Sequence, residues 1–167
     1  MSIRRLLALL LAASGCRSAQ AAARFAAAPP PVPVVRFRSG TTAFSTYSGI
    51  DDSLTAVVRD SAAWTQLWQR IQRPFFPRPS APAVNFSREM VVVAALGRRP
   101  NAGYDIVIDG AERTRDGVAV DVLVRSPAPG CPVEAAITQP VDLGRVPVTD
   151  GPISFRERHV SIPCDAR

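Results

Sequence analysis

The sequence contains no lysine, so all twenty of its basic residues are arginine, and the formal net charge is +6. A surface that binds nucleic acid normally gathers its cations on one face or along one helix. Here the arginines are scattered along the chain, and alanine, proline and glycine are abundant, as in proteins of GC-rich genomes. The composition therefore argues against a nucleic-acid partner.

Histidine is almost absent, because His159 is the single one in the chain. A serine triad would need it beside an activated serine, but no G-x-S-x-G stretch occurs. A zinc site with one histidine would need thiolates, which an exported protein holds oxidised. We therefore expect His159 to be a half-exposed strand residue, and we expect no catalytic residue, metal or cofactor. A hydrolase or metal-dependent enzyme that uses unrecognised residues is the alternative.

The apolar run at residues 6–13 is too short to span a bilayer as a permanent helix, and two arginines precede it. This is the pattern of an export signal. Residues 13–16, ASGC, follow directly and resemble the bacterial lipoprotein box, in which the cleaved chain begins at a lipid-bearing cysteine. We therefore predict a lipoprotein signal peptide over residues 1–15 and a lipid anchor at Cys16. The alternative is ordinary cleavage after AQA at 19–21, which would release a soluble protein.

Cysteine is scarce, and its count of three is odd. If Cys16 carries lipid, Cys131 and Cys164 remain, and an oxidising compartment lets them pair. Closing a loop of this length contributes roughly 3–4 kcal/mol in the chain-entropy model. We predict a Cys131–Cys164 disulfide, with two free thiols as the alternative. The protein is then exported and faces the periplasm or the cell exterior.

Residues 17–40 are rich in alanine and proline and show no sustained amphipathic period. The PPPVP run at residues 29–33 favours an extended polyproline conformation, which makes a semi-rigid spacer. We therefore expect a tether over residues 16–42 and a folded domain over residues 43–167.

Hydrophobic periodicity predicts one helix in the domain, capped by Asp60 or Ser61 and ended by Pro74. Its apolar side chains recur at i, i+3, i+4 and i+7 and place both tryptophans on one stripe. At this spacing a stripe is more often core than a ligand platform. The stripe consists of Trp64, Leu67, Trp68 and Ile71.

Strands account for most of the remaining domain. Residues 90–96 are apolar at every position, as expected for a central strand that is buried on both faces. Residues 104–109 and 118–125 alternate and read as a hairpin with its turn at Asp116-Gly117. Further strands are expected at residues 55–59, 141–148 and 153–160. The predicted fold class is α+β, mainly antiparallel β, in a sheet or a sandwich with one amphipathic helix.

The hairpin places charged residues opposite its apolar face. Any register that groups the apolar side chains also groups Asp105, Asp109, Asp121 and Arg125. Three carboxylates on one face could bind calcium or share a proton. Apolar residues lie among them, however, and Arg125 can pair across the strands, so a solvated, partly salt-bridged face is favoured.

Residues 97–104, GRRPNAGY, connect the buried strand to the hairpin. Glycines tolerate positive φ and proline fixes one torsion, so this loop has a restrained shape. Two glycines six apart without lysine make a poor phosphate cradle. Restraint lowers the entropy lost on docking, and arginine and tyrosine are common interface anchors. We predict a partner-binding loop, with an ordinary solvated connection as the alternative. Its binding residues would be Arg98, Arg99, Pro100, Asn101, Gly103 and Tyr104.

Three stretches of the chain carry a family resemblance: WTQLW at 64–68, VNFSREMVVV at 84–93 and LGRRPNAGYDI at 96–106. With PAPG at 127–130 and TQP at 138–140, they resemble the C-terminal domain family of the protease-complex subunit PrcB. The similarity spans roughly residues 53–148, with asparagines at 85 and 101 where the family pattern has aspartate and threonine. The resemblance implies a non-catalytic envelope module that associates with or stabilises a secreted protease.

The 97–104 loop also looks like the N-P-T-T-G-Y loop of chagasin-type cysteine-protease inhibitors, which sit on an immunoglobulin-like sandwich. This analogy makes an inhibitor-like module an alternative function. A purely structural envelope lipoprotein is a third possibility. The sequence as a whole predicts an envelope lipoprotein that binds a protein partner, with the membrane contacted through its lipid.

Overall fold

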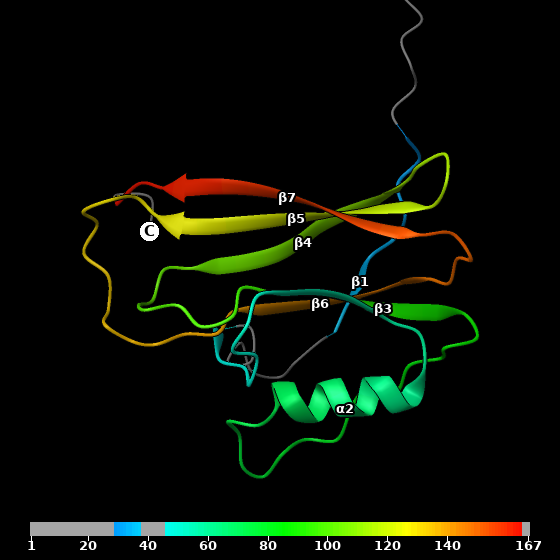
Figure 1. Cartoon of the computed structure of the whole chain (residues 1–167), viewed down its shortest axis with the longest axis horizontal. Helices are drawn as coiled ribbons and strands as arrows, with labels where there is room; N and C mark the ends of the chain where they lie inside the picture. The colour runs from blue at the N-terminus through cyan, green and yellow to red at the C-terminus, as the bar shows by residue number, and fades with distance from the viewer. Residues whose placement is uncertain (1–28, 38–45, 165–167) are drawn as a thin grey trace, which may run out of the picture.

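The computed structural model describes residues 29–37 and 46–164, which form two facing sheets with one helix outside them (Figure 1). One sheet has the strand order β1-β6-β3-β2 and the other β4-β5-β7. The elements are β1 (Val35–Arg36), β2 (Leu54–Val58), α2 (Ser61–Ile71), β3 (Glu89–Ala95), β4 (Asp105–Arg113), β5 (Val118–Pro127), β6 (Val141–Pro147) and β7 (Ile153–Ile162). The predicted class, α+β with mainly β content, is confirmed.

The predicted export signal, lipid anchor and first part of the tether lie outside the described residues. In the part of the chain that the structure describes, no helix is long and apolar enough to cross a membrane.

Strand β3 lies at the centre of the molecule, paired with β2 on one side and β6 on the other. Six of its seven residues are buried. Met90, Val92 and Ala94 pack toward the β4-β5-β7 sheet, whereas the alternate side chains pack toward α2. Because both faces are covered, each of these six buried positions requires an apolar side chain. The predicted strand buried on two faces is therefore confirmed.

Helix α2 begins where the sequence predicts. Asp60 is its N-cap, and the Asp60 side chain accepts a hydrogen bond from the Ala63 N–H at 2.8 Å. Trp64 and Trp68 are only 3% and 6% exposed and lie in the core that includes Val91 and Val93. Their indole N–H groups donate to backbone carbonyls of the proline-rich loop that follows the helix. The tryptophan stripe is core, as predicted.

The β4–β5 hairpin is confirmed, with Ile106 opposite Val124 and Ile108 opposite Val122. The register shifts between Ile108 and Gly110, so one extra residue is inserted on β4 at this point. The apolar face of the hairpin packs against the even-numbered residues of β3.

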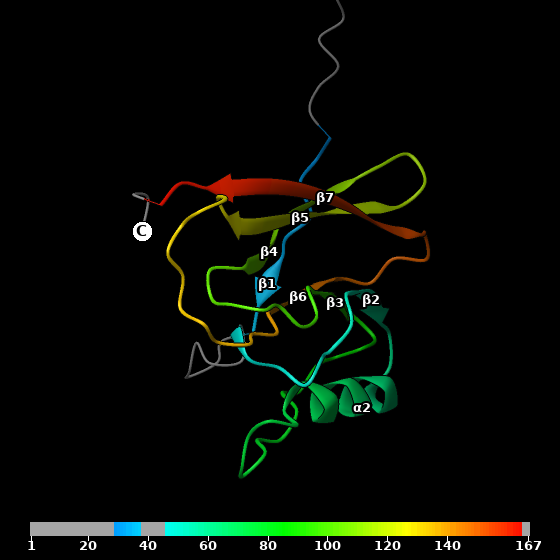
Figure 2. The same ribbon diagram turned by 60° about the vertical axis from the view of Figure 1, so that its left-hand side comes forward.

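The last two strands lie close to their predicted ranges but in different sheets (Figure 2). Strand β6 is already paired with β1 and β3. The chain therefore crosses to the other sheet after β6, and β7 pairs with β5 in parallel, from Val118 opposite Ile153 to Pro127 opposite Ile162. This parallel pair departs from the antiparallel arrangement that the sequence suggests.

The predicted tether needs a correction, because part of it belongs to the folded domain. Pro31 forms a bridge with Glu112, and the Val32 N–H donates to the Ala111 carbonyl at 2.7 Å. Val32 is 7% exposed, and the next residues form β1 on the edge of the other sheet. An extended proline-rich backbone has nearly the geometry of an edge strand, so composition alone did not separate the two. The domain thus includes residues before 43.

The predicted Cys131–Cys164 pair is present as a disulfide, with its Cα atoms 5.2 Å apart. It joins the connection between β5 and β6 to the residues that follow β7.

Replacing Trp68 with alanine should lower the free energy of unfolding by about 3–5 kcal/mol, because a large buried side chain is lost and a cavity is left. Chemical denaturation followed by circular dichroism would measure this difference. Gln66→Ala, an exposed change on the same helix, should alter stability by less than about 0.5 kcal/mol. Equal stabilities for the two variants would contradict the packing described for the helix.

Peptide mapping of the protein under non-reducing conditions should recover the Cys131 and Cys164 peptides linked, because the fold brings their backbones within disulfide range. Reduction before digestion should separate them. Recovery of both as free thiols from the untreated protein would show that the disulfide does not form.

Candidate functional site

The predicted binding loop, residues 97–104, lies at the end of the sandwich where β3 finishes and β4 begins (Figure 1). Gly97 and Gly103 adopt φ values of 72° and 100°, in the region that other residues rarely enter. A Cβ atom on Gly97 would lie 2.7 Å from the Asp51 carbonyl oxygen. Both glycines are therefore needed for the loop's shape, and Gly97 also for its close packing against Asp51.

Backbone hydrogen bonds hold the loop to two neighbouring segments. The Arg98 N–H donates to the Asp51 carbonyl at 2.9 Å. Arg99 and Thr138 exchange two bonds, at 2.8 and 3.1 Å, and the Ala102 N–H donates to the Glu134 carbonyl at 3.0 Å. The loop is therefore a braced structure, supported on both sides.

The two adjacent arginines have different environments. Arg98 is exposed, and its guanidinium reaches the Asp51 carboxylate at 3.4 Å. Arg99 is half-buried, with its guanidinium carbon 5.7 Å from the centre of the Tyr104 ring. This distance suits a cation–π contact. Of the two arginines predicted to bind a partner, only Arg98 therefore faces solvent, whereas Arg99 contacts Tyr104 within the loop.

The other four residues predicted to bind a partner also divide into exposed and partly buried ones. Pro100 and Gly103 are exposed, whereas Asn101 and Tyr104 are partly buried. In the described part of the chain, the Asn101 Oδ1 and Arg99 Nε atoms are buried without a hydrogen-bond partner. The surface available to a partner therefore consists of Arg98, Pro100 and Gly103.

Asp51 supports the loop and was not found from the sequence. Its carboxylate accepts hydrogen bonds from Arg73 at 2.7 Å, from the Gln139 side chain at 2.6 Å and from Arg98. The Arg73 bond, followed by that of Gln139, holds the pKa of Asp51 below its usual value. Asp51 therefore stays ionised at neutral and mildly acidic pH. No local pattern marks this residue, because its partners lie 22 to 88 positions away.

Thr138 is the second residue that sequence reasoning missed. It is fully buried, and besides its backbone pairing with Arg99, its hydroxyl donates to the Asn101 carbonyl at 3.2 Å. The connection between β5 and β6 that carries it has no strand of its own, so hydrophobic periodicity provided no signal.

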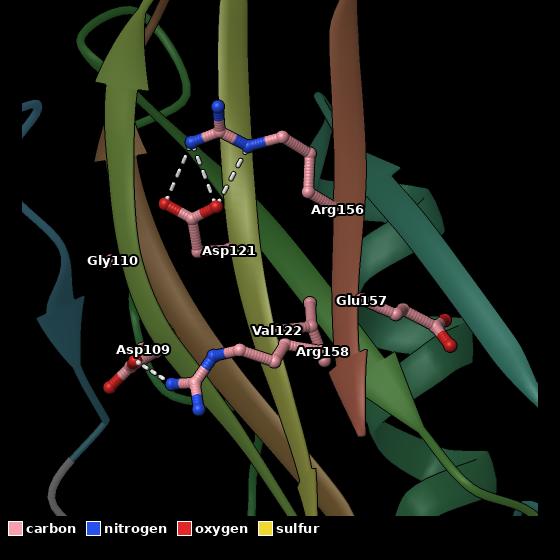
Figure 3. A pocket seen from close by; sticks show the side chains of 7 residues that line it. All are labelled: Asp109, Gly110, Asp121, Val122, Arg156, Glu157 and Arg158. Carbon is pink, nitrogen blue, oxygen red and sulfur yellow. Dashed lines mark hydrogen bonds and ion pairs between the residues drawn. The ribbon is translucent and has the colours of Figure 1, made fainter. Parts of the chain in front are cut away.

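The predicted carboxylates are paired with arginines on the outer face of the β4-β5-β7 sheet, as Figure 3 shows for Asp109 and Asp121. Asp105 lies 2.7 Å from Arg125, Asp121 lies 2.8 Å from Arg156, and Asp109 lies 3.2 Å from Arg158. The salt-bridged face is thus confirmed. Asp121, and then Glu112, raises the pKa of Arg156. The sequence did not identify Arg156 and Arg158 of β7 as partners of these carboxylates. Their position beside the carboxylates depends on the parallel pairing of β7 with β5, which the sequence did not predict.

The same face holds a shallow depression of about 240 Å³, lined by seven residues. Its two aspartates, Asp109 and Asp121, are paired with the β7 arginines Arg158 and Arg156. Among the residues that the structure describes, no three histidine, cysteine or acidic side chains are grouped so that they could hold a metal ion. His159 lies exposed on β7, 3.3 Å from Glu157.

Comparison with known proteins gives one match. No curated protein and no solved structure matches the chain significantly. The family model described as PrcB C-terminal matches residues 90–147, which run from β3 to the end of β6 and include the whole 97–104 loop and its support at Thr138. The resemblance read from the sequence is therefore confirmed by this family match over residues 90–147.

Proposed function

We propose that this chain is a non-catalytic lipoprotein of the cell envelope that binds another envelope protein, a secreted protease, through residues 97–104. The family match supports an association with a protease complex. The observation that carries the proposal is the bracing of the loop, because its backbone is hydrogen-bonded to Asp51, Glu134 and Thr138 while Arg98 stays exposed. A loop fixed before docking loses little conformational entropy when it binds.

The position of the loop supports the same function. The described chain begins beside the β4–β5 turn, where the Pro30 carbonyl accepts the Arg113 N–H at 3.0 Å. The loop lies at the opposite end of the sandwich, where β3 ends (Figure 1). Twelve residues lie between Cys16 and Pro29, and the thirteen residue steps that join the two can span at most about 45 Å. A lipid at Cys16 would thus attach the domain by the end remote from the loop and leave the loop facing a partner.

An inhibitor-like module is the second candidate function. A braced loop at the end of a two-sheet sandwich is the arrangement that would insert into a protease cleft and resist cleavage. The two candidates differ in one result, since an inhibitor lowers the activity of the captured protease and a stabilising subunit does not.

Arg98→Ala should weaken capture of the protein partner from a detergent extract of the envelope by about tenfold, because arginine anchors at interfaces are commonly worth more than 1 kcal/mol. Quantitative mass spectrometry of the captured proteins would measure it. Arg99 is left unchanged because its contact with Tyr104 would confuse the result.

Arg115→Ala is the matched control, because Arg115 is also exposed but lies in the β4–β5 turn at the other end of the domain. Both variants should keep the stability of the parent within about 0.5 kcal/mol. Equal capture by the two variants would show that the 97–104 loop is a connection and not a binding site.

Cys16→Ser should move the protein from the membrane fraction to the soluble fraction, because the change removes the proposed site of lipid attachment. Fractionation and immunoblotting of the two forms would test it, with N-terminal sequencing of the mature protein as a second measurement. A mature chain that begins at Ala22 would instead support ordinary signal-peptide cleavage.

A further inference from the structure

The connection between β5 and β6, residues 128–140, supports the 97–104 loop at two points. Near its middle, the Glu134 carbonyl accepts the Ala102 N–H at 3.0 Å. Near its end, Thr138 pairs with Arg99 through two backbone bonds and with the Asn101 carbonyl through its hydroxyl. The position of the loop therefore depends on the position of this connection.

The two points of support are secured differently. Thr138 is fully buried, and the next residue, Gln139, donates its N–H to the Thr46 carbonyl at 2.8 Å. Glu134 is exposed and lies three residues after Cys131, which the disulfide attaches to Cys164 beyond the end of β7. The support at Thr138 thus comes from a buried residue that is held by packing. The support at Glu134 comes from an exposed residue close to the disulfide.

We propose that the Cys131–Cys164 disulfide regulates the binding loop, and that its reduction by a dithiol of the envelope's thiol–disulfide exchange proteins releases residues 101–103 and weakens partner binding. This rests on the proposed function of the loop. Reduction leaves β6 and β7 paired with their neighbours, so the effect is local to the connection and to the half of the loop that it supports.

The exposure of the two cysteines sets the order of the reaction. Cys164 is exposed and Cys131 is half-buried, so a thiolate of the external dithiol attacks the Cys164 sulfur. Cys131 leaves as a thiolate and takes a proton. The second thiol of the dithiol then attacks the mixed disulfide and releases Cys164 as a thiol. The dithiol loses two electrons and becomes a disulfide, and the protein gains two thiols.

Amide hydrogen exchange tests the inference without a partner. Full-length Cys16→Ser protein, in which Cys131 and Cys164 are the remaining cysteines, is compared before and after treatment with dithiothreitol. Exchange at the Ala102 amide should become at least about tenfold faster, because its acceptor is released, while the Arg99 amide should change less than about threefold. The buried Val92 amide of β3 is the control for global unfolding and should keep its protection.

Two exchange results would overturn the inference: an unchanged rate at Ala102, or an equal rise at Ala102, Arg99 and Val92, which would mean that reduction unfolds the domain. Cys131→Ser combined with Cys164→Ser should reproduce the reduced protein without dithiothreitol. A double variant with the exchange rates of the oxidised form would also overturn it.

Measurements of partner capture distinguish a failure of the disulfide inference from a failure of the proposed function. Reduction of the Cys16→Ser protein should lower capture by about fivefold or more, since a loop that must be ordered on binding loses affinity. If reduction leaves capture unchanged while Arg98→Ala weakens it, the loop binds the partner but the disulfide does not regulate it, and the inference is wrong. If Arg98→Ala has no effect, the proposed function fails, and the exchange rate at Ala102 alone decides whether the disulfide positions the loop.

Discussion

The burial of β3 on both faces is the constraint on which the other layers depend. Its even-numbered side chains require an apolar sheet on one side, which the β4–β5 hairpin and β7 provide. Its odd-numbered side chains require an apolar stripe on the other, which Trp64 and Trp68 of α2 provide. Where β3 ends, Gly97 turns the chain at a positive φ and begins the 97–104 loop. The loop is therefore anchored directly to the most buried strand of the protein.

Two segments that are distant in sequence meet around this loop, and each contributes hydrogen bonds. Asp51 holds one side through its carbonyl and its carboxylate, and Thr138 holds the other through its backbone and hydroxyl. Arg99 contacts Tyr104 from behind, which leaves Arg98 in solvent. This arrangement fixes the surface that we propose binds a protein partner.

The arginine content of the chain has a structural outcome on the outer face of the β4-β5-β7 sheet. The strands β5 and β7 supply Arg125, Arg156 and Arg158, which pair with the carboxylates of the outer face. These exposed pairs contribute little to the free energy of folding. They do remove the acidic cluster as a cation site, since each aspartate already has a guanidinium partner.

The sequence by itself determined the elements whose evidence is local. The period of the tryptophan stripe defined α2, the unbroken apolar run defined β3, alternation defined the β4–β5 hairpin, and the odd cysteine count selected Cys131 and Cys164. Tertiary structure alone decided that residues 31–36 join both sheets, that β7 runs parallel to β5, and that Asp51 and Thr138 brace the loop. It also decided that Arg99 turns inward while Arg98 does not. The physical reason is that periodicity reports which face of an element is apolar, whereas pairing partners and burial depend on contacts between residues that are far apart in the chain.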